Sequence, residues 1–389
     1  MNLAFLLPEY PHPKVSAHCG GIGTSAKNLA TGLVMNAHKL TIFVYGQDKD
    51  ELFYDGLIEI HKIKHLRYPY FGWFLYRKHL QNYINEVIVA QKIQLLEAPD
   101  WTGITAFMKL KCPIVIRLHG SDAYFCKLEE RKQKLKNFIF EKCALKKAKA
   151  IISVSNFTAN KTKQIFKITK NIEIIYNGID TDNFKDNINL KEILNGKEIG
   201  NDILYFGSII RKKGVLELPD IFNRVIEKLP QTKLTFLGKD VLDNITGKPT
   251  LDLFKELLSK KALNNFIYIE QVPYNEVITY IYRASVVVLP SFAEAFPMTW
   301  LEAMAMSKAL VTSNIGWAEE IIIDGVTGYS LHPKNHLDYA NKIIELLQNK
   351  ELRNKIGANA RMHINNNFAL KIIIYKNEQF YQKIINNDF

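Results

Sequence analysis

Two glutamates in the second half of the sequence carry its most specific chemical pattern. Glu294 and Glu302 are eight residues apart, and Pro297 between them favours the start of a helix. Glu294 is then expected in the loop before the helix, and Glu302 within it. Two carboxylates so placed need not work as an acid and a base, because they can accept hydrogen bonds from hydroxyl groups at two points of one ligand. The helix N-terminus between them would face a phosphate.

A second candidate for phosphate binding is the basic loop 207–214, which reads GSIIRKKG. It follows an apolar run and places Arg211, Lys212 and Lys213 just before a glycine and a helical pattern. Adjacent cations on such a loop suit a diphosphate. A loop of cations exposed to water is the alternative.

The first half offers a glycine cluster. Gly20, Gly21 and Gly23 precede Thr24 and Ser25, which are expected to open a helix, so the backbone there can approach an anion closely. The loop before these glycines is about a dozen residues long, and the strict G-x-G-x-x-G pattern is absent. A dinucleotide cofactor such as NAD is therefore not expected.

A histidine and an acidic segment also follow strand-like runs. His119 comes after the run 113–118, where a side chain of a parallel sheet can touch a ligand. The alternative is a histidine whose partners are neighbouring backbone groups. The segment 97–103 (EAPDWTG) is a third site of this kind, after the run 93–97.

The elements that must position these residues alternate along the chain. Strand-like runs occur at 3–7, 40–45, 93–97, 113–118 and 150–154, and again at 203–206, 233–237, 266–269, 285–290 and 309–312. Helical patterns between them cover 24–37, 79–91, 126–148, 214–229, 251–262, 274–283 and 297–306. This alternation predicts an α/β fold with two Rossmann-like domains facing across a cleft, joined near 171–200. Such an architecture favours an enzyme that holds one substrate per domain.

Composition sets the class of protein. The 389 residues are 47% hydrophobic and 23% charged, as expected for globular domains. No apolar run approaches the roughly 20 residues of a membrane span. The run 3–7 ends at Pro8 with no basic residue before it, so a first strand rather than a signal peptide is expected, and a cytoplasmic location with it. Four cysteines lack metal-ligand spacing and are expected to be reduced thiols: Cys19, Cys112, Cys126 and Cys143.

The net charge of +12 is concentrated in the first half. Residues 1–170 hold 26 Lys and Arg against 13 Asp and Glu, whereas residues 171–389 hold 25 against 26. Within the first half, 101–170 hold 16 basic and 4 acidic residues. This asymmetry points to an anionic partner, and without any nucleic-acid-binding motif nucleic acid is not expected.

Two segments are candidates for contact with an anionic membrane surface. The segment 127–149 combines many lysines with apolar residues at helical spacing, which predicts an amphipathic basic helix. The segment 67–78 places aromatic residues between basic ones, as interfacial segments do. The alternatives are a solvated helix face for the first, and a buried loop and helix start for the second.

Taken in order, the motifs are similar to those of one family. They read GGIGTSAKNLA, RLHGSD, VSNFT, IIYNGIDTDNF, ILYFGSIIRKKG, VVLPSFAEAFPMTWLEAMA and DGVTGY. Over nearly the whole chain the sequence resembles the family 4 retaining glycosyltransferases of the GT-B fold, and the spacing from Glu294 to Glu302 is its most specific part. The resemblance implies an acceptor-side domain over 1–172, a nucleotide-sugar domain over 173–371, and a C-terminal helix over 372–389 that crosses back onto the first domain.

The resemblance also implies roles for matching residues. Glu302 would bind the nucleotide ribose and Glu294 the donor sugar, while Lys213 and Arg211 would neutralise the departing diphosphate. His119 would lie beside the anomeric region of the transferred sugar. Further donor-binding positions would be Gly207, Ser208, Ala295, Phe296, Met298 and Thr299. The loop of Gly20, Gly21 and Gly23 would admit the donor phosphate and the acceptor. The implied hexosyl transfer retains configuration and needs no metal or other cofactor.

Two positions depart from the family pattern. Ser208 stands where the family places an arginine after the glycine of the phosphate loop, and Arg211, three residues on, is the candidate substitute. Ala295, Phe296 and Pro297 replace the usual Gly-Phe-Gly, and Pro297 lacks an N–H that could contact the sugar. The identity of the donor therefore stays open.

The leading hypothesis is a transferase that moves a sugar from a UDP- or GDP-linked donor to a glycan or lipid-linked acceptor, in cell-surface polysaccharide or glycolipid synthesis. A cytoplasmic location is expected, and the lipid-linked acceptor would place the enzyme peripherally on the inner face of the membrane. Transfer to a small soluble acceptor is an alternative, as is a non-catalytic protein that binds sugar nucleotides. A two-domain solute receptor is disfavoured because no export signal is recognised.

Overall fold

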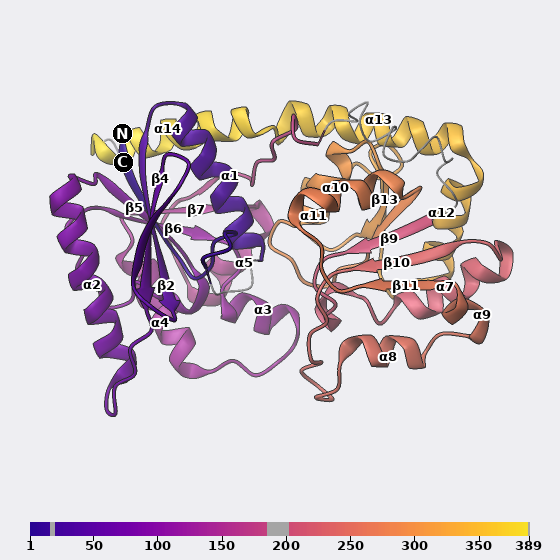
Figure 1. Ribbon diagram of the computed structural model, residues 1–389, viewed down its shortest axis with the longest axis horizontal. Helices are drawn as coiled ribbons and strands as arrows, with labels where there is room; N and C mark the ends of the chain where they lie inside the picture. Colours follow the sequence, from indigo (N-terminus) through magenta and orange to yellow (C-terminus); the bar gives the residue numbers. More distant parts are fainter. Residues whose placement is uncertain (16–19, 185–201, 388–389) are drawn as a thin grey trace. The chain divides into compact units, whose positions relative to one another are not determined.

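The computed structural model describes residues 1–15, 20–184 and 202–387, and the chain divides into two compact units (Figure 1). Unit 1 comprises Met1–Ile179 and Ala369–Phe389, and unit 2 comprises Asp180–Phe368. The chain therefore passes from one unit to the other after residue 179 and returns after residue 368. The predicted boundaries, 172/173 and 371/372, lie a few residues away, because strand β8 (Ile172–Ile174) pairs with its neighbour β7 in the sheet of unit 1.

Unit 1 is built on an eight-stranded sheet with the order β3-β4-β2-β1-β5-β6-β7-β8. Its strands besides β8 are β1 (Asn2–Leu7), β2 (Lys39–Gln47), β3 (Glu51–Asp55), β4 (Ile58–Lys64), β5 (Leu95–Pro99), β6 (Ile114–Leu118) and β7 (Ala150–Ser153). Its helices are α1 (Gly21–Met35), α2 (Gly72–Gln91), η1 (Trp101–Gly103), α3 (Asp122–Leu128), α4 (Leu135–Lys147), α5 (Asn156–Phe166) and α14 (Leu370–Ile385). The strands pair in parallel, except β3 with β4.

Unit 2 is built on a six-stranded parallel sheet with the order β11-β10-β9-β12-β13-β14. Its strands are β9 (Asp202–Phe206), β10 (Lys233–Leu237), β11 (Phe266–Ile269), β12 (Val286–Leu289), β13 (Ala309–Ser313) and β14 (Tyr329–Leu331). Its helices are η2 (Arg211–Lys213), α7 (Leu218–Lys228), α8 (Thr250–Glu256), α9 (Lys260–Asn264), α10 (Tyr274–Arg283), α11 (Met298–Ala305), η3 (Ala318–Glu320), α12 (His336–Gln348) and α13 (Lys350–Asn367).

The two faces of the sheet in unit 1 are covered by different helices. In β1, Leu3 and Phe5 pack with α1 and α14 on one face, while Ala4 and Leu6 pack with α2 and α4 on the other. The strand is apolar at every one of these positions because it is buried on both sides, as expected for a parallel sheet between helices. Gly32 in α1 allows close packing, since a Cβ there would lie 1.8 Å from Cδ1 of Ile374 in α14.

Several predicted elements need correction. The helix predicted at 126–148 is broken, because Glu130 adopts a left-handed φ of +53° and separates α3 from α4. The helix predicted from residue 24 begins at Gly21, and the single helix predicted at 251–262 is divided into α8 and α9. Strands β3, β4, β8 and β14 were not predicted; β4 buries His61 and Lys62, so its sequence lacks a clean apolar alternation.

The strand order of each sheet indicates where a ligand would bind. The strand order reverses beside the first strand of each unit, between β1 and β5 in unit 1 and between β9 and β12 in unit 2. In open parallel sheets, ligands bind outside the carboxyl ends of the strands at such a point. The loops after these four strands are therefore the positions in which to look for a site.

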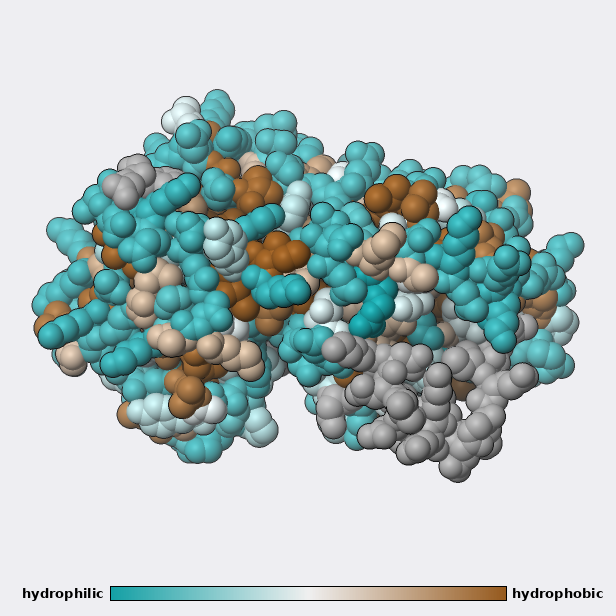
Figure 2. Space-filling view, turned by 90° about the horizontal axis from the view of Figure 1, so that it is seen from above, coloured by the Kyte–Doolittle hydropathy of each residue, from teal (hydrophilic) through white to brown (hydrophobic). Residues whose placement is uncertain are grey.

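The surface carries little continuous apolar area in the view of Figure 2, where most side chains are hydrophilic and the hydrophobic ones form separate small groups. Among the helices in the described ranges, none has the length and apolar character needed to cross a membrane.

Candidate functional site

The loop after β9 brings a glycine and a lysine together in unit 2. Gly207 follows β9 directly and has a φ of +122°. A Cβ at this position would lie 3.3 Å from Nζ of Lys213. The glycine therefore allows the backbone to turn and leaves room for the Lys213 ammonium group at the end of the strand.

The basic loop 207–214 is joined to the loop after β12 by backbone contacts. The N–H groups of Phe292 and Ala293 donate hydrogen bonds to the carbonyl oxygen of Lys212 over 2.8 and 3.2 Å. Gly214 has a φ of +71°, and a Cβ there would lie 1.9 Å from the carbonyl oxygen of Pro290. Glycine is needed at this position for the two loops to approach so closely. The basic loop and the loop that carries Glu294 therefore lie against each other.

Lys213 and Glu294 form an ion pair at the centre of this site. Nζ of Lys213 lies 3.4 Å from Oε1 of Glu294, and the hydroxyl of Ser291 donates to the same oxygen over 3.2 Å. The side chains of Lys213 and Glu294 are 21% and 13% exposed, so both reach solvent. The pair presents a cation and a hydrogen-bond acceptor to a ligand at the same place.

Glu302 lies deeper, in helix α11, and is buried. The hydroxyl of Tyr274 donates a hydrogen bond to Oε1 of Glu302 over 2.7 Å. Burial raises the pKa of Glu302, while the Tyr274 hydrogen bond and the charge of Lys213 act in the opposite direction. The sequence analysis missed Tyr274, whose signal is an aromatic residue at the start of the helix predicted at 274–283.

Arg211 pairs with a different carboxylate from Lys213. Its Nε and Nη2 donate to the two carboxylate oxygens of Asp243 over 2.7 and 3.0 Å. Asp243 also accepts hydrogen bonds from the backbone and side chain of Thr246, and the hydrogen bond from Arg211 is the main cause that lowers its pKa. Arg211 thus anchors the segment after β10, because a bidentate pair holds the guanidinium in one orientation.

In unit 1, His119 follows β6 and its backbone N–H donates to Oδ1 of Asp100 over 2.9 Å. Burial, with a smaller contribution from the charge of Arg117, lowers the pKa of His119 to about 3. The imidazole is therefore neutral at pH 7. It can donate or accept a hydrogen bond, but it supplies no positive charge.

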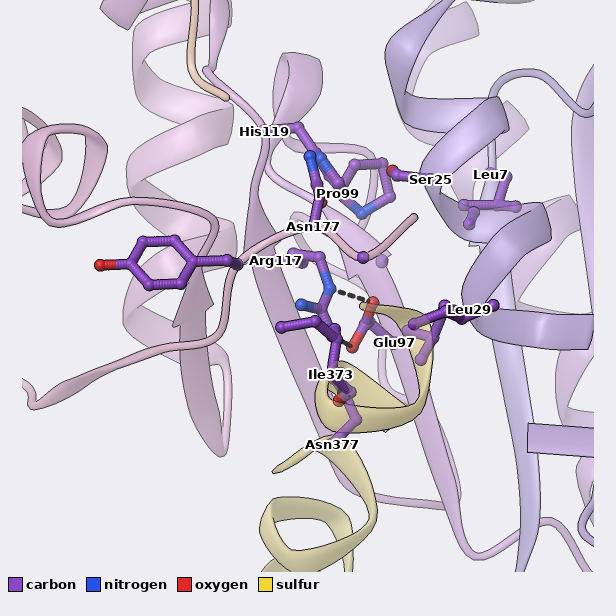
Figure 3. A pocket seen from close by; sticks show the side chains of 15 residues that line it. Leu7, Ser25, Leu29, Glu97, Pro99, Arg117, His119, Asn177, Ile373 and Asn377 are labelled. Carbon is purple, nitrogen blue, oxygen red and sulfur yellow. Dashed lines mark hydrogen bonds and ion pairs between the residues drawn. The ribbon is translucent and has the colours of Figure 1, made fainter. Parts of the chain in front are cut away.

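A pocket in unit 1 lies at the carboxyl ends of β1 and β5, and His119 lines it with Ser25, Pro99 and Asn177 (Figure 3). Glu97 and Arg117 also line it; their bidentate pair is buried, with distances of 2.7 and 2.9 Å. The sequence analysis expected segment 97–103 after a strand, but Glu97 lies inside β5 and holds Arg117 of β6.

Helix α14 completes the wall of this pocket. Arg117 donates from Nη2 to Oδ1 of Asn377 and, over 3.2 Å, to the hydroxyl of Tyr381. That hydroxyl donates in turn to Oε2 of Glu97 over 2.6 Å. The C-terminal helix thus provides polar partners for a buried ion pair next to His119, a contribution that spacing along the chain does not reveal.

Two family models match the chain in succession. The model described as Glycosyltransferase Family 4 matches residues 19–183, and the model described as Glycosyl transferases group 1 matches residues 186–363. The chain belongs to glycosyltransferase family 4. The glycosyl-transfer class predicted from the motifs is therefore confirmed at the level of the family.

Relatives and solved structures agree with this placement. An uncharacterized glycosyltransferase of Methanocaldococcus jannaschii is 29% identical over 366 residues, which are 92% of this chain and 92% of the relative. The capsular polysaccharide biosynthesis glycosyltransferase CapM of Staphylococcus aureus is 27% identical over a match that covers 64% of this chain and 65% of CapM. The structure of Anabaena HepE in complex with UDP-glucose matches with a TM-score of 0.74 at 18% identity, covering 98% of this chain and 100% of HepE. The predicted α/β fold with two Rossmann-like domains of the GT-B type is confirmed.

The glycine loop of this glycosyltransferase is already in contact with a carboxylate. Oε1 of Glu9 accepts hydrogen bonds from the N–H groups of Gly20 and Gly23 over 3.0 and 2.8 Å. Gly21 and Gly23 lie within the first turn of α1, and Gly20 is its N-cap. The donors expected to meet a phosphate thus meet Glu9, whose charge suits a helix N-terminus. Cys19 lies outside the described residues, and Cys112, Cys126 and Cys143 are free thiols.

The remaining expected donor-binding residues of the glycosyltransferase divide into two groups. Ala295, Phe296 and Met298 are buried, and the Phe296 ring packs 5.5 Å from that of Phe368. Ser208 and Thr299 are half-buried at the site; the carbonyl oxygen of Ser208 accepts a hydrogen bond from Tyr205. Helix α11 begins at Met298, one residue later than predicted, with Pro297 as its N-cap. Among the described residues, no group of three or more His, Cys, Asp and Glu side chains is arranged to hold a metal ion.

Proposed function

We propose that this glycosyltransferase moves a hexosyl group from a nucleotide-diphosphate donor to a glycan or lipid-linked acceptor, with retention of the anomeric configuration and without a metal. The observation that carries the proposal is the arrangement of Lys213, Glu294 and Glu302 at the ends of β9 and β12. Lys213 lies 3.4 Å from Glu294, and its charge partly opposes the burial that raises the pKa of Glu302. One cation and two carboxylates at the switch point suit a ligand with a diphosphate between two hydroxyl-bearing groups.

Three residues of unit 2 would each bind a different part of the donor. Glu302 accepts hydrogen bonds from the ribose hydroxyls, and the donor takes the place of the Tyr274 hydroxyl there. Glu294 accepts hydrogen bonds from the sugar. As the bond from the sugar to the diphosphate breaks, negative charge grows on the diphosphate, and the Lys213 ammonium and the N-terminus of α11 stabilise it.

His119 would contact the transferred sugar from unit 1. Because burial lowers its pKa to about 3, the imidazole acts as a neutral hydrogen-bond partner. A cation there would be repelled by the positive charge that develops on the anomeric carbon. Neutral His119 therefore suits this position, and its ionisation should not appear in the pH profile of transfer above about pH 5.

The donor and the pathway are supported by the relatives. Anabaena HepE has been solved in complex with UDP-glucose, which favours a UDP-linked donor over a GDP-linked one. CapM is named for capsular polysaccharide biosynthesis, which favours a role in cell-surface polysaccharide synthesis.

A thermal-shift screen against UDP- and GDP-sugars tests the proposal, followed by a transfer assay with the donor that binds. Binding of the correct donor raises Tm by mass action. Glu302→Ala should lose the shift, whereas Glu294→Ala should keep most of it and lose transfer. Glu227→Ala, at an exposed position of α7, is the matched control and should behave as wild type. The proposal fails if no nucleotide sugar raises Tm, or if Glu302→Ala responds like the control.

A further inference from the structure

The two segments that the sequence analysis treated separately come together in unit 1. The Trp73 ring of α2 lies 5.0 Å from the Phe140 ring of α4 and 5.8 Å from the Phe107 ring, and Phe107 lies 5.7 Å from Phe140. Trp73 also contacts Phe74 at 5.8 Å. The start of α2, the turn after η1 and the helix α4 therefore form one continuous aromatic cluster.

Five aromatic residues of this cluster and its rim reach solvent. We call them the aromatic face: Tyr70, Phe71, Trp73, Phe74 and Phe107, with exposed fractions of 78%, 73%, 37%, 43% and 38%. Phe71 is the N-cap residue of α2, and its carbonyl oxygen accepts hydrogen bonds from the N–H groups of Phe74 and Leu75. These bonds hold its backbone at the start of the helix that carries Trp73 and Phe74. Exposed aromatic residues gathered in this way mark an interaction surface rather than scattered surface side chains.

Two residues of the aromatic face adopt a left-handed backbone conformation, which is unfavourable for phenylalanine. Phe71 has a φ of +51° and Phe107 a φ of +66°. Glycine or asparagine would occupy the left-handed region at less cost, and neither phenylalanine is buried. Phe107 also packs against Trp73 and Phe140, but Phe71 is 73% exposed. Packing within the fold therefore does not account for an aromatic side chain at Phe71, whereas contact with an apolar phase would.

Exposed cations occur in the same segments of the chain as the aromatic face, or close to them in sequence. They are Arg67, Lys78, Lys109, Lys134 and Lys136. Lys136 lies over the Phe140 ring at 5.7 Å, which places its charge at the edge of the cluster. The segments 61–85, 101–121 and 131–140 contain no Asp or Glu. An apolar centre with a positively charged rim is complementary to the apolar interior and anionic headgroups of a lipid bilayer.

The aromatic face rests on a rigid base. Arg77 is buried beneath it, donates to the carbonyl oxygens of Trp73 and Gly103 over 3.0 and 3.2 Å, and places its guanidinium 4.3 Å from the Phe140 ring centre. Gly103 permits this contact, since a Cβ there would lie 2.3 Å from the backbone of Phe140. A surface held in this way can insert without first rearranging.

Helix α4, which supports the aromatic face, also contacts the segment that follows His119. Glu141, next to Phe140, is buried and accepts hydrogen bonds from the backbone N–H groups of Thr102, Asp122 and Ala123. Asp122 and Ala123 open the helix that follows His119. Consecutive residues of α4 thus support the aromatic face and the loop that carries His119.

We propose that the aromatic face of α2 and α4 binds the surface of an anionic lipid bilayer and so presents unit 1 to a membrane-embedded acceptor. This deepens the proposed function and rests on it only for the acceptor. The juxtaposition of the two segments, the left-handed aromatic residues and the acid-free basic rim carry the inference.

Co-sedimentation of the full chain with vesicles tests the proposal. Vesicles of phosphatidylglycerol and phosphatidylcholine should bind the protein at low salt, while vesicles of phosphatidylcholine alone should bind it weakly. High salt should weaken binding, because the charges of the rim are exposed and screened. No binding to the anionic vesicles at low salt would overturn the proposal, as would equal binding to both kinds of vesicle at every salt concentration.

Paired variants locate the binding surface. Lys134→Glu with Lys136→Glu should reduce binding by about tenfold or more. The control, Lys260→Glu with Lys261→Glu in α9 of unit 2, makes the same change in net charge at exposed positions and should bind as wild type. Phe71→Asn, which suits a left-handed φ, should also weaken binding, while Leu57→Ser at a residue 81% exposed elsewhere in unit 1 should not. Equal losses in variants and controls would contradict the proposal.

Fluorescence of Trp73 provides a second readout. Trp300 and Trp317 are fully buried and Trp101 is half-buried, whereas Trp73 is 37% exposed within the aromatic face. The emission shift on vesicle binding is therefore expected from Trp73: Trp73→Phe should remove it and Trp101→Phe should keep it. A shift that persists in Trp73→Phe would place the contact elsewhere. Donor binding, measured without vesicles, separates the proposals: a protein that binds donor but no vesicle refutes only the membrane inference, and one that binds vesicles but no donor refutes only the proposed function.

Discussion

The backbone N–H of His119 donates a hydrogen bond to Oδ1 of Asp100 over 2.9 Å, and Asp100 is almost fully buried. Burial is the main cause that raises the pKa of Asp100 to about 8, although hydrogen bonds from His119 and Gly120 oppose it. The residue that orients the histidine loop is therefore a neutral acid at pH 7.

Asp100→Asn should alter the pH dependence of stability. Between about pH 4, where an unfolded Asp ionises, and about pH 8, the folded chain binds more protons at Asp100 than the unfolded chain, so the free energy of unfolding decreases as pH rises. Asparagine keeps an acceptor for His119 and should remove up to about 1.4 kcal/mol per pH unit of that decrease. Urea unfolding across the window measures it. The exposed Glu227→Gln is the control, and an Asp100→Asn profile as steep as wild type would refute the assignment.

Gly214→Ala should displace the loop that carries Glu294. The variant faces a left-handed φ of +71° and a contact of 1.9 Å with the carbonyl oxygen of Pro290. Gly247→Ala has nearly the same φ, +72°, but no atom within 4 Å of the new Cβ. Backbone strain of about 1–2 kcal/mol is thus common to both variants. Only Gly214→Ala should also abolish the donor-induced Tm shift, and an equal shift in both variants would contradict the role given to the loop contact.

Lys213 and Arg211 should respond differently to removal. Lys213→Ala should lower kcat/KM by about 100-fold, because it removes charge stabilisation of the departing diphosphate. Arg211→Ala should instead lower the free energy of unfolding by about 2 kcal/mol, since it leaves the buried Asp243 carboxylate without its main partner. Steady-state kinetics and urea unfolding of both variants separate the roles. If Arg211→Ala lowered kcat/KM as much as Lys213→Ala and left the free energy of unfolding unchanged, Arg211 would instead contact the diphosphate.

Tyr381→Phe should weaken the packing of α14 against strands β5 and β6 of unit 1. The hydroxyl bridges Glu97 and Arg117, with distances of 2.6 and 3.2 Å, so its loss should lower the free energy of unfolding by about 2 kcal/mol. Tyr375→Phe removes a hydroxyl from the same helix at a residue 62% exposed and should have almost no effect. Chemical denaturation of both variants makes the comparison; matching values would show that the buried bridge adds no stability.

Local patterns along the chain were sufficient for the fold class. Alternating apolar runs and helical patterns predicted most of the parallel strands, because burial on both faces leaves strands such as β1 continuously apolar. Strand β4 was missed because it buries His61 and Lys62, which give no apolar signal. The break between α3 and α4 was missed because it depends on the left-handed backbone of Glu130, a residue type common in helices.

Residue types and short spacings were also enough to propose the Glu294–Glu302 pair and the Lys213 loop as site residues, since these groups lie close in sequence to the strand ends that carry them. The partners of those groups come from distant parts of the chain and emerged only in the folded structure: Asp243 holds Arg211, Tyr274 holds Glu302, and Asn377 and Tyr381 reach Arg117 from α14. The fusion of segments 67–78 and 127–149 into one face is of the same kind. Spacing along a chain constrains only neighbours, whereas these contacts arise from side-chain packing after the sheets and helices have assembled.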